Sequence, residues 1–93
     1  IIIVGGQKVY PSEVESVILK MTEVDDVSIY PEKNSLLGSI VCAKIITNEN
    51  YKGQNPKKMI RSFCNDKIEK FKIPVKVSIA NSLVGKRLKK IRS

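Results

Sequence analysis

Residues 4–15 read Val-Gly-Gly-Gln-Lys-Val-Tyr-Pro-Ser-Glu-Val-Glu, and they set the local structure of the N-terminal part of the chain. Residues 1–4 are rich in β-forming side chains, and residues 7–10 can return as a second short strand. Gly5 and Gly6 lie between these two runs, and a Gly-Gly pair suits a tight two-residue turn. The stretch therefore predicts a β-hairpin.

A helix is predicted directly after the hairpin. Pro11 ends the second strand, and Ser12 with Glu15 fits a capping box, in which the two side chains satisfy backbone N–H groups of the first turn. Apolar residues then recur at the spacing of one helix face: Val14, Val17, Ile18 and Met21. The apolar face of this helix can cover a sheet.

Three further strands are expected downstream. Residues 27–30 alternate apolar and polar side chains, and Pro31 is expected to end that strand. After a loop marked by Gly38, residues 39–47 are apolar on most of both faces, which indicates a buried strand. Residues 75–80 alternate again and predict a final strand.

A second helix is predicted between the last two strands. Asn55 and Pro56 are a typical helix start, with an N-cap followed by proline at the first helical position. The helix is expected to run until Pro74, with one apolar stripe: Ile60, Phe63, Cys64, Ile68 and Phe71. The predicted fold class is α+β, with an N-terminal β-hairpin plus a small, mostly antiparallel three-stranded sheet packed by two amphipathic helices.

The charge of the chain is uneven. The 93 residues carry 17 Lys and Arg against 9 Asp and Glu, which gives a net charge of +8. Residues 1–49 hold four bases and seven acids, a net of −3, whereas residues 50–93 hold thirteen bases and two acids, a net of +11. Such a half-basic chain favours an anionic partner, such as nucleic acid, a membrane surface or a phosphate-bearing cofactor.

The composition argues against several kinds of active site. The chain has no histidine, so a nucleophile activated by histidine is excluded and the commonest metal ligand is missing. Cys42 and Cys64 are too far apart for a CxxC motif and have apolar neighbours, so we expect two reduced core thiols and no metal site. The longest apolar run is residues 1–4, and we expect a cytoplasmic protein without a signal peptide or transmembrane segment.

Residues 4–15 also resemble the segment that opens the C-terminal domain of the adenylate-forming enzymes. This superfamily comprises the acyl-CoA synthetases, the adenylation domains of non-ribosomal peptide synthetases and the luciferases. The matching positions are Gly6, Val9, Pro11, Glu13, Val14 and Glu15. The resemblance continues at residues 71–74, Phe-Lys-Ile-Pro, and at the Gly-Lys pair of residues 85–86, and it covers essentially the whole chain.

The resemblance implies that residues 1–93 are a single lid domain of an AMP-forming ligase. Lys86 would enter the active site during adenylation and contact the carboxylate substrate and phosphate oxygens. Gly5 and Gly6, with Lys8 beside them, would line the passage of the pantetheine arm of coenzyme A. ATP and Mg²⁺ would be bound mainly by a large N-terminal adenylation domain of the same protein. We therefore expect the 93 residues alone to be inert.

The chain departs from the family pattern at two places. Ile3 stands where the family usually has lysine, and Leu83-Val84 runs into Gly85-Lys86 without the usual proline and threonine. The shorter loop changes how far Lys86 can reach. The basic tail that follows also offers Arg87 and Lys89, in a run with Lys90 and Arg92, as a second way to meet the 3′-phosphate of coenzyme A or an acidic carrier protein.

Two alternatives to a coenzyme A ligase are open at this point. The acceptor can be a carrier-protein thiol or an amine, although the sequence of residues 5–15 is mildly closer to that of the coenzyme A ligases. A small basic nucleic-acid-binding module is the other alternative. Its charge fits, but no predicted strand carries the paired stacking aromatics that sheet-based RNA binders use, so we expect no nucleic-acid partner.

Overall fold

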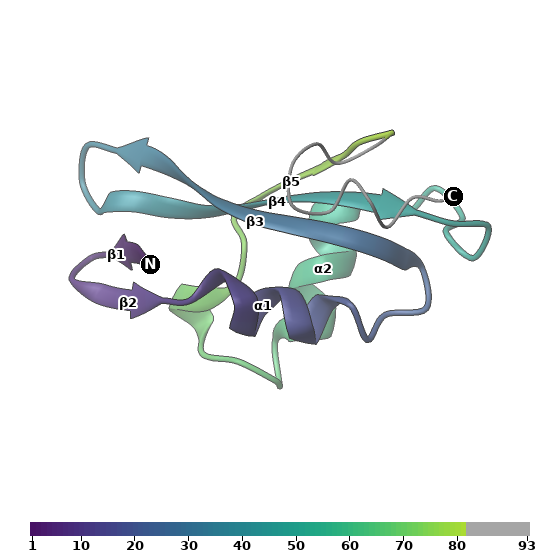
Figure 1. The fold of residues 1–93 in the computed structure, drawn as a ribbon, viewed down its shortest axis with the longest axis horizontal. Coiled ribbons are helices and arrows are strands. Elements are labelled where there is room, and N and C mark those ends of the chain that lie inside the picture. The colour runs from purple at the N-terminus through teal and green to yellow at the C-terminus, as the bar shows by residue number, and fades with distance from the viewer. Residues whose placement is uncertain (82–93) are drawn as a thin grey trace.

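The computed structural model describes residues 1–81 as a five-stranded sheet with two α-helices, which confirms the α+β class (Figure 1). The elements in chain order are β1 (Ile2–Val4), β2 (Gln7–Val9), α1 (Pro11–Ile18), β3 (Val24–Asn34), β4 (Gly38–Thr47), α2 (Pro56–Cys64), the 3-10 helix η1 (Lys70–Lys72) and β5 (Lys76–Ile79).

Strand β4 is the centre of the sheet. It runs antiparallel to β3 along its whole length and parallel to β5, from the pair Cys42 and Lys76 to the pair Ile45 and Ile79. The β1–β2 hairpin joins the same sheet through one antiparallel pair, Val4 with Gly38. The hairpin is therefore attached to the predicted three-stranded sheet and extends it to five strands.

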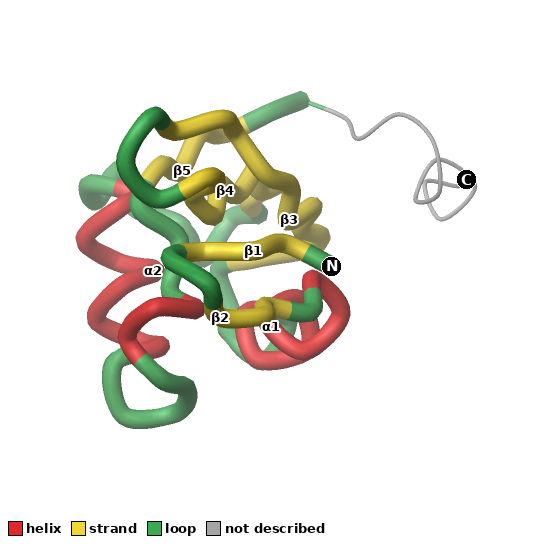
Figure 2. Tube along the Cα trace, turned by 90° about the vertical axis from the view of Figure 1, so that its left-hand side faces the viewer, coloured by secondary structure: helices red, strands yellow, loops and turns green. Residues whose placement is uncertain are grey.

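Both helices pack on one side of the sheet, as the two views in Figures 1 and 2 show. Alternate residues of the strands face the helices and are buried, because successive side chains of a strand point to opposite faces. The buried core combines these strand residues with the apolar faces of the helices: Val27, Ile29, Val41, Ala43, Ile45, Val14, Ile18, Ile60 and Cys64.

The capping box predicted for Ser12 and Glu15 is wrong. Helix α1 begins at Pro11 with Tyr10 as its N-cap residue, and no side chain caps it. Glu15 is instead buried, with 3% of its surface exposed, and its Oε2 accepts a hydrogen bond of 3.0 Å from the backbone N–H of Ile29. Because β3 lies at the edge of the sheet, this N–H has no partner strand, and a carboxylate from α1 satisfies it.

Strand β3 does not end before Pro31 as predicted, but continues to Asn34. Pro31 pairs with Val41 of β4 within the ladder. The N–H of Ile29, two residues earlier, points away from β4, so the nitrogen of Pro31 faces the same free edge. A proline that lacks a donor on the outer edge of an edge strand costs the ladder no hydrogen bond.

The second helix begins as predicted but is shorter. Asn55 Oδ1 accepts a hydrogen bond of 3.0 Å from the N–H of Lys58, and Pro56 occupies the first turn. The helix ends at Cys64, ten residues before Pro74. Ile68 and Phe71 still pack against the core, but from a turn and from η1, so their helical spacing did not require one continuous helix.

We expect Glu15→Ala to lower the free energy of unfolding by about 1–3 kcal/mol, because a buried N–H at Ile29 loses its acceptor. Glu15→Gln keeps an acceptor oxygen at this place and should cost less. The measurement is urea unfolding followed by circular dichroism. Glu49→Ala, which truncates an exposed glutamate, is the control, and an equal loss in both alanine variants would refute the role of the carboxylate.

Candidate functional site

The turn between β1 and β2 is held in a conformation that favours glycine. Gly5 has a φ of 56° and Gly6 a φ of 85°, both in the left-handed region that side chains disfavour. The N–H of Gly5 donates a hydrogen bond of 2.9 Å to the carbonyl of Leu37 in the β3–β4 turn. The glycine turn is therefore fixed against the neighbouring turn by its backbone.

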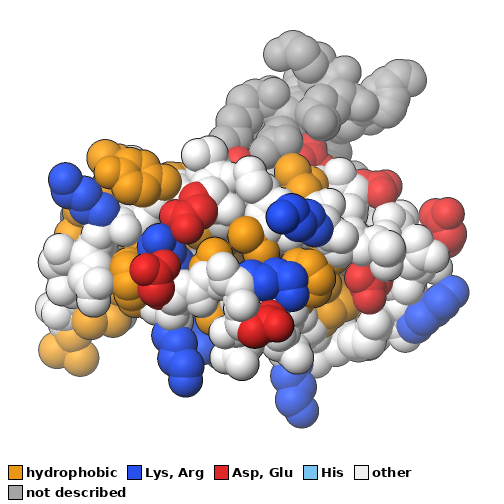
Figure 3. All heavy atoms as spheres, turned by 90° about the horizontal axis from the view of Figure 1, so that it is seen from below, with side chains coloured by type: hydrophobic (Ala, Val, Ile, Leu, Met, Phe, Trp, Pro, Cys, Tyr) orange, Lys and Arg blue, Asp and Glu red, His pale blue; other side chains and the backbone are white. Residues whose placement is uncertain are grey.

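The end of the domain that carries these two turns exposes several apolar side chains. Asn34 Oδ1 accepts hydrogen bonds from the N–H groups of Leu36 and Leu37, which shapes the β3–β4 turn. Leu36 is nevertheless 92% exposed, and Ile1, Ile3 and Leu37 are exposed as well. Figure 3 shows hydrophobic side chains gathered at this end. Exposed apolar side chains of this kind are compatible with a contact to another protein surface or a ligand.

A cavity of about 390 Å³ lies beside the glycine turn. Its walls come from the hairpin, from β4 with the turn before it, and from η1 with the segment that leads to β5: Val4, Gly5, Gln7, Leu37, Ile40, Val41, Lys70, Phe71, Ile73 and Val75. Most of these side chains are apolar. The cavity therefore brings together the glycine turn and residues 71–74, which are distant in sequence.

A salt-bridge cluster on the surface joins residues 71–74 to the start of α1. Lys72 Nζ lies 3.1 Å from Glu13 Oε1 and 2.8 Å from Glu69 Oε1. The hydrogen bond to Glu69, followed by the one to Glu13, raises the pKa of Lys72. The hydrogen bond from Lys72 in turn lowers the pKa of Glu69. Within residues 71–74, Lys72 thus holds η1 against the start of α1.

We expect Lys72→Gln to lower the melting temperature most between about pH 5 and pH 10. Because the pKa of Glu69 is lowered in the folded state, its ionised carboxylate stabilises the fold at pH values above the ordinary glutamate pKa. This stabilisation is lost as the pH falls through the folded-state pKa of Glu69. Because the pKa of Lys72 is raised in the folded state, its charged ammonium stabilises the fold at pH values below the ordinary lysine pKa. This stabilisation is lost as the pH rises through the folded-state pKa of Lys72. Melting curves against pH, with Lys20→Gln as control, measure the effect, and a pH-independent difference would contradict it.

The structure places the predicted site residues as follows. Gly5 lines the cavity, and Gly6 is exposed at the turn. Lys8 is exposed on β2, paired with Ile3, and is not among the residues that line the cavity. Gly85, Lys86, Arg87 and Lys89 lie outside the described residues.

Sequence reasoning missed the part of this site that η1 supplies. Lys70, Phe71 and Ile73 line the cavity, but the helical pattern assigned Phe71 to a core stripe and did not single out Lys70. The proline at position 74 was the available signal, since η1 and an extended segment precede it instead of an α-helix.

Other kinds of chemistry find little support within residues 1–81. Cys42 and Cys64 are free and buried, as predicted, and burial raises the pKa of both thiols, so neither is a thiolate nucleophile near neutral pH. No group of three or more potential metal-ligating side chains is present in this part of the chain. No helix among the described residues is long and apolar enough to cross a membrane.

A comparison with known protein families shows which class of domain this is. Residues 13–90 match the family described as AMP-binding enzyme C-terminal domain, and the chain belongs to this family.

Two curated relatives are coenzyme A ligases. A long-chain-fatty-acid–CoA ligase of Mycobacterium tuberculosis is 31% identical over 97% of this chain and 18% of its own length. A 2-succinylbenzoate–CoA ligase of Listeria innocua is 30% identical over 89% of this chain and 17% of its own length. The chain thus spans about a sixth of the relatives that it matches.

Solved structures show the same similarity. A fatty acyl CoA synthetase of Mycobacterium tuberculosis superposes with a TM-score of 0.77 at 30% identity, over 87% of this chain and 16% of that chain. An acyl-CoA synthetase of Brucella canis reaches a TM-score of 0.83 at 20% identity, over 89% of this chain and 16% of that chain. The second likeness concerns the fold alone.

Proposed function

We propose that residues 1–93 are the mobile C-terminal lid domain of an AMP-forming acyl-CoA synthetase that acts in the cytoplasm. In the first half-reaction a carboxylate oxygen attacks the α-phosphorus of ATP, and pyrophosphate leaves. In the second, a thiol sulfur attacks the acyl carbonyl carbon, and AMP leaves. The observation that carries the proposal is the glycine turn beside an apolar cavity, in a chain whose curated relatives are coenzyme A ligases.

The hairpin suits the second half-reaction. A Cβ atom built at Gly6 would meet no atom within 4 Å, so the backbone there borders open space. A slender ligand can approach such a turn closely, because no side chain stands in its way. The pantetheine arm of coenzyme A is slender and uncharged, and an apolar cavity next to the turn is compatible with it. Gly5, Gly6 and Lys8 are proposed to lie along this arm.

The first half-reaction is assigned to Lys86. A lysine presents a compact charge on a long stem, and such a charge can stabilise the negative charge that develops on the phosphate oxygens during displacement. Arg87 and Lys89 are proposed to meet phosphate groups nearby. ATP and Mg²⁺ are expected to be held mainly by the larger domain. Rotation of the lid between the half-reactions would present Lys86 first and the glycine turn second.

The apolar end of the domain supports such a role, because a lid must dock on its partner. Leu36 and Leu37 of the β3–β4 turn lie at this end and are 92% and 44% exposed. Burial of these side chains against the adenylation domain would contribute favourably to closure each time the lid rotates. The same end carries the glycine turn, so docking would bring the turn to the active site.

The two half-reactions, measured separately, test the proposal. The protein that contains this domain and its adenylation domain should catalyse ATP–pyrophosphate exchange in the presence of a carboxylic acid, and then form an acyl-CoA. The 93-residue chain alone should do neither. Exchange catalysed by the 93 residues alone, or transfer of the acyl group to a carrier protein in preference to coenzyme A, would contradict the proposal.

A further inference from the structure

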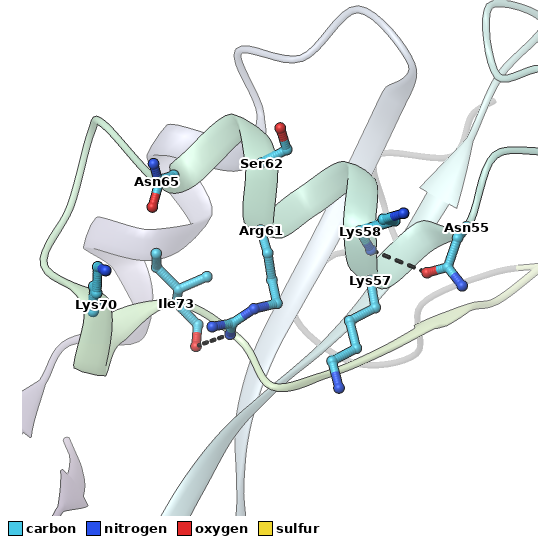
Figure 4. Close-up of a pocket in the computed structure, with 8 residues that line it drawn as sticks. All are labelled: Asn55, Lys57, Lys58, Arg61, Ser62, Asn65, Lys70 and Ile73. Carbon is cyan, nitrogen blue, oxygen red and sulfur yellow. Dashed lines mark hydrogen bonds between the residues drawn. The ribbon is translucent and has the colours of Figure 1, made fainter.

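A second, larger cavity of about 620 Å³ lies along α2 (Figure 4). Eight residues line it: Asn55, Lys57, Lys58, Arg61, Ser62, Asn65, Lys70 and Ile73. Half of them carry a positive charge, three more carry amide or hydroxyl groups, and none is acidic. This set of side chains offers hydrogen-bond donors and positive charge for an anion.

The regular spacing of α2 places these groups in two neighbouring rows on the helix surface. Lys57 and Arg61 are four residues apart, as are Lys58 and Ser62, and residues at this spacing are neighbours on a helix surface. Figure 4 shows the side chains of Lys57 and Arg61 extending from α2 toward the segment that carries Ile73. Lys70 of η1 adds a fourth charge from outside the helix.

Arg61 is held in place by the fold. Its guanidinium donates a hydrogen bond of 2.9 Å to the carbonyl of Pro74 and a longer one of 3.5 Å to the carbonyl of Ile73. The side chain is half-buried, so it is less mobile than a free surface arginine. An ordered guanidinium loses less conformational entropy when it binds an anion, which favours binding.

The charges of this cavity are not neutralised by neighbouring acids. The four salt bridges formed within residues 1–81 use Lys67, Lys72 and Lys76, and none uses Lys57, Lys58, Arg61 or Lys70. The four uncompensated charges around one concave surface concentrate positive potential there. A multiply charged anion would gain more from this arrangement than a single carboxylate would.

The basic cavity adjoins the apolar one. Lys70 and Ile73 line both, so η1 and the segment after it form a shared wall. A ligand with an uncharged arm and a phosphorylated end could occupy both cavities at once. Its arm would lie beside Gly5 in the apolar cavity, and its phosphate groups would lie beside α2 in the basic cavity.

We propose that the α2 cavity is a phosphate-binding site for the phosphorylated end of a small thiol ligand. The choice of a thiol ligand rests on the proposed function, with coenzyme A as the acceptor. The anion site itself does not, because it stands on the charges, the cavity and the ordered arginine. Lys57, Arg61 and Lys70 are the proposed phosphate contacts, and Asn55, Ser62 and Asn65 add neutral donors.

The first experiment uses inorganic pyrophosphate as the probe and needs no ligase chemistry. Amide shifts of the ¹⁵N-labelled 93-residue chain should move on titration, and the largest changes should lie in α2 and η1. Lys57→Gln/Lys70→Gln should weaken binding about tenfold or more, since each charge-assisted hydrogen bond contributes roughly that factor. This double variant leaves the hydrogen bonds of Arg61 intact, so it should fold normally.

Lys20→Gln/Lys33→Gln is the matched control, because it removes two exposed charges that do not line either cavity. Its affinity for pyrophosphate should stay within about twofold of the unsubstituted chain at 150 mM salt, where distant charges are largely screened. Equal weakening in both double variants, or shifts spread over the whole chain, would overturn the site.

The second experiment identifies the ligand in the complete protein. Lys57→Gln/Lys70→Gln should raise the KM for coenzyme A about tenfold, and the control variant should leave it unchanged. A smaller effect on the KM for 3′-dephospho-coenzyme A would place the 3′-phosphate in the cavity, and an equal effect would place the diphosphate there. An unchanged KM for coenzyme A overturns the ligand assignment. Failure of the proposed function is distinguishable, because the unsubstituted protein would then form no acyl-CoA at all.

Discussion

Lys86→Ala in the complete protein should slow acyl-adenylate formation by about 100-fold or more, the usual effect of removing one preorganised charge from a displacement at a charged centre. The reason is that negative charge develops on the phosphate oxygens as pyrophosphate leaves, and a lysine ammonium can stabilise it in a site shielded from water. ATP–pyrophosphate exchange measures this step directly.

The second half-reaction is the sharpest control for Lys86. Acyl transfer from preformed acyl-adenylate to coenzyme A should proceed at the unsubstituted rate, because Lys86 is proposed to act only before the lid rotates. Lys20→Ala, which removes an exposed lysine elsewhere, should change neither step. Unchanged exchange in Lys86→Ala would show that this lysine does not act in adenylate formation.

The element order followed from local patterns, whereas several contacts between elements did not. Asn55 and Pro56 were sufficient to locate the start of α2, because an N-cap acts on the adjacent turn. Glu15 was misassigned because its partner, the N–H of Ile29, lies fourteen residues away and is free only because β3 is an edge strand. A capping pattern in the sequence cannot reveal that the N–H of Ile29 competes with the helix N-terminus for the Glu15 carboxylate.

The candidate site was predictable in part for the same reason. The two glycines of the turn are a local signal, and positive φ values are what the hairpin requires of them. The cavity beside them depends on how η1 and β5 return to β4, where the N–H of Val75 bonds to the carbonyl of Val41 at 2.9 Å. This parallel pairing spans more than thirty residues of chain, and only the folded arrangement brings Phe71 to the glycine turn.

Gly6→Leu should slow acyl transfer to coenzyme A by about 100-fold in the complete protein while adenylate formation stays near the unsubstituted rate; displacing a reactant by about 1 Å is enough for such a loss. A Cβ at Gly6 meets no atom within 4 Å, so the new side chain would project into the open space beside the turn, where the pantetheine arm is proposed to pass. Single-turnover transfer from preformed acyl-adenylate is the measurement.

Backbone strain is the competing cause of any loss at Gly6, and the chain provides a matched control for it. Gly53 has a φ of 86°, nearly the 85° of Gly6, and a Cβ built there also meets nothing within 4 Å. Gly53→Leu should therefore cost the same left-handed strain, about 1–2 kcal/mol of stability, without touching the hairpin. If Gly53→Leu slows acyl transfer as much as Gly6→Leu does, strain explains the loss. If only Gly6→Leu does so while both variants are equally destabilised, the glycine turn acts in the transfer step.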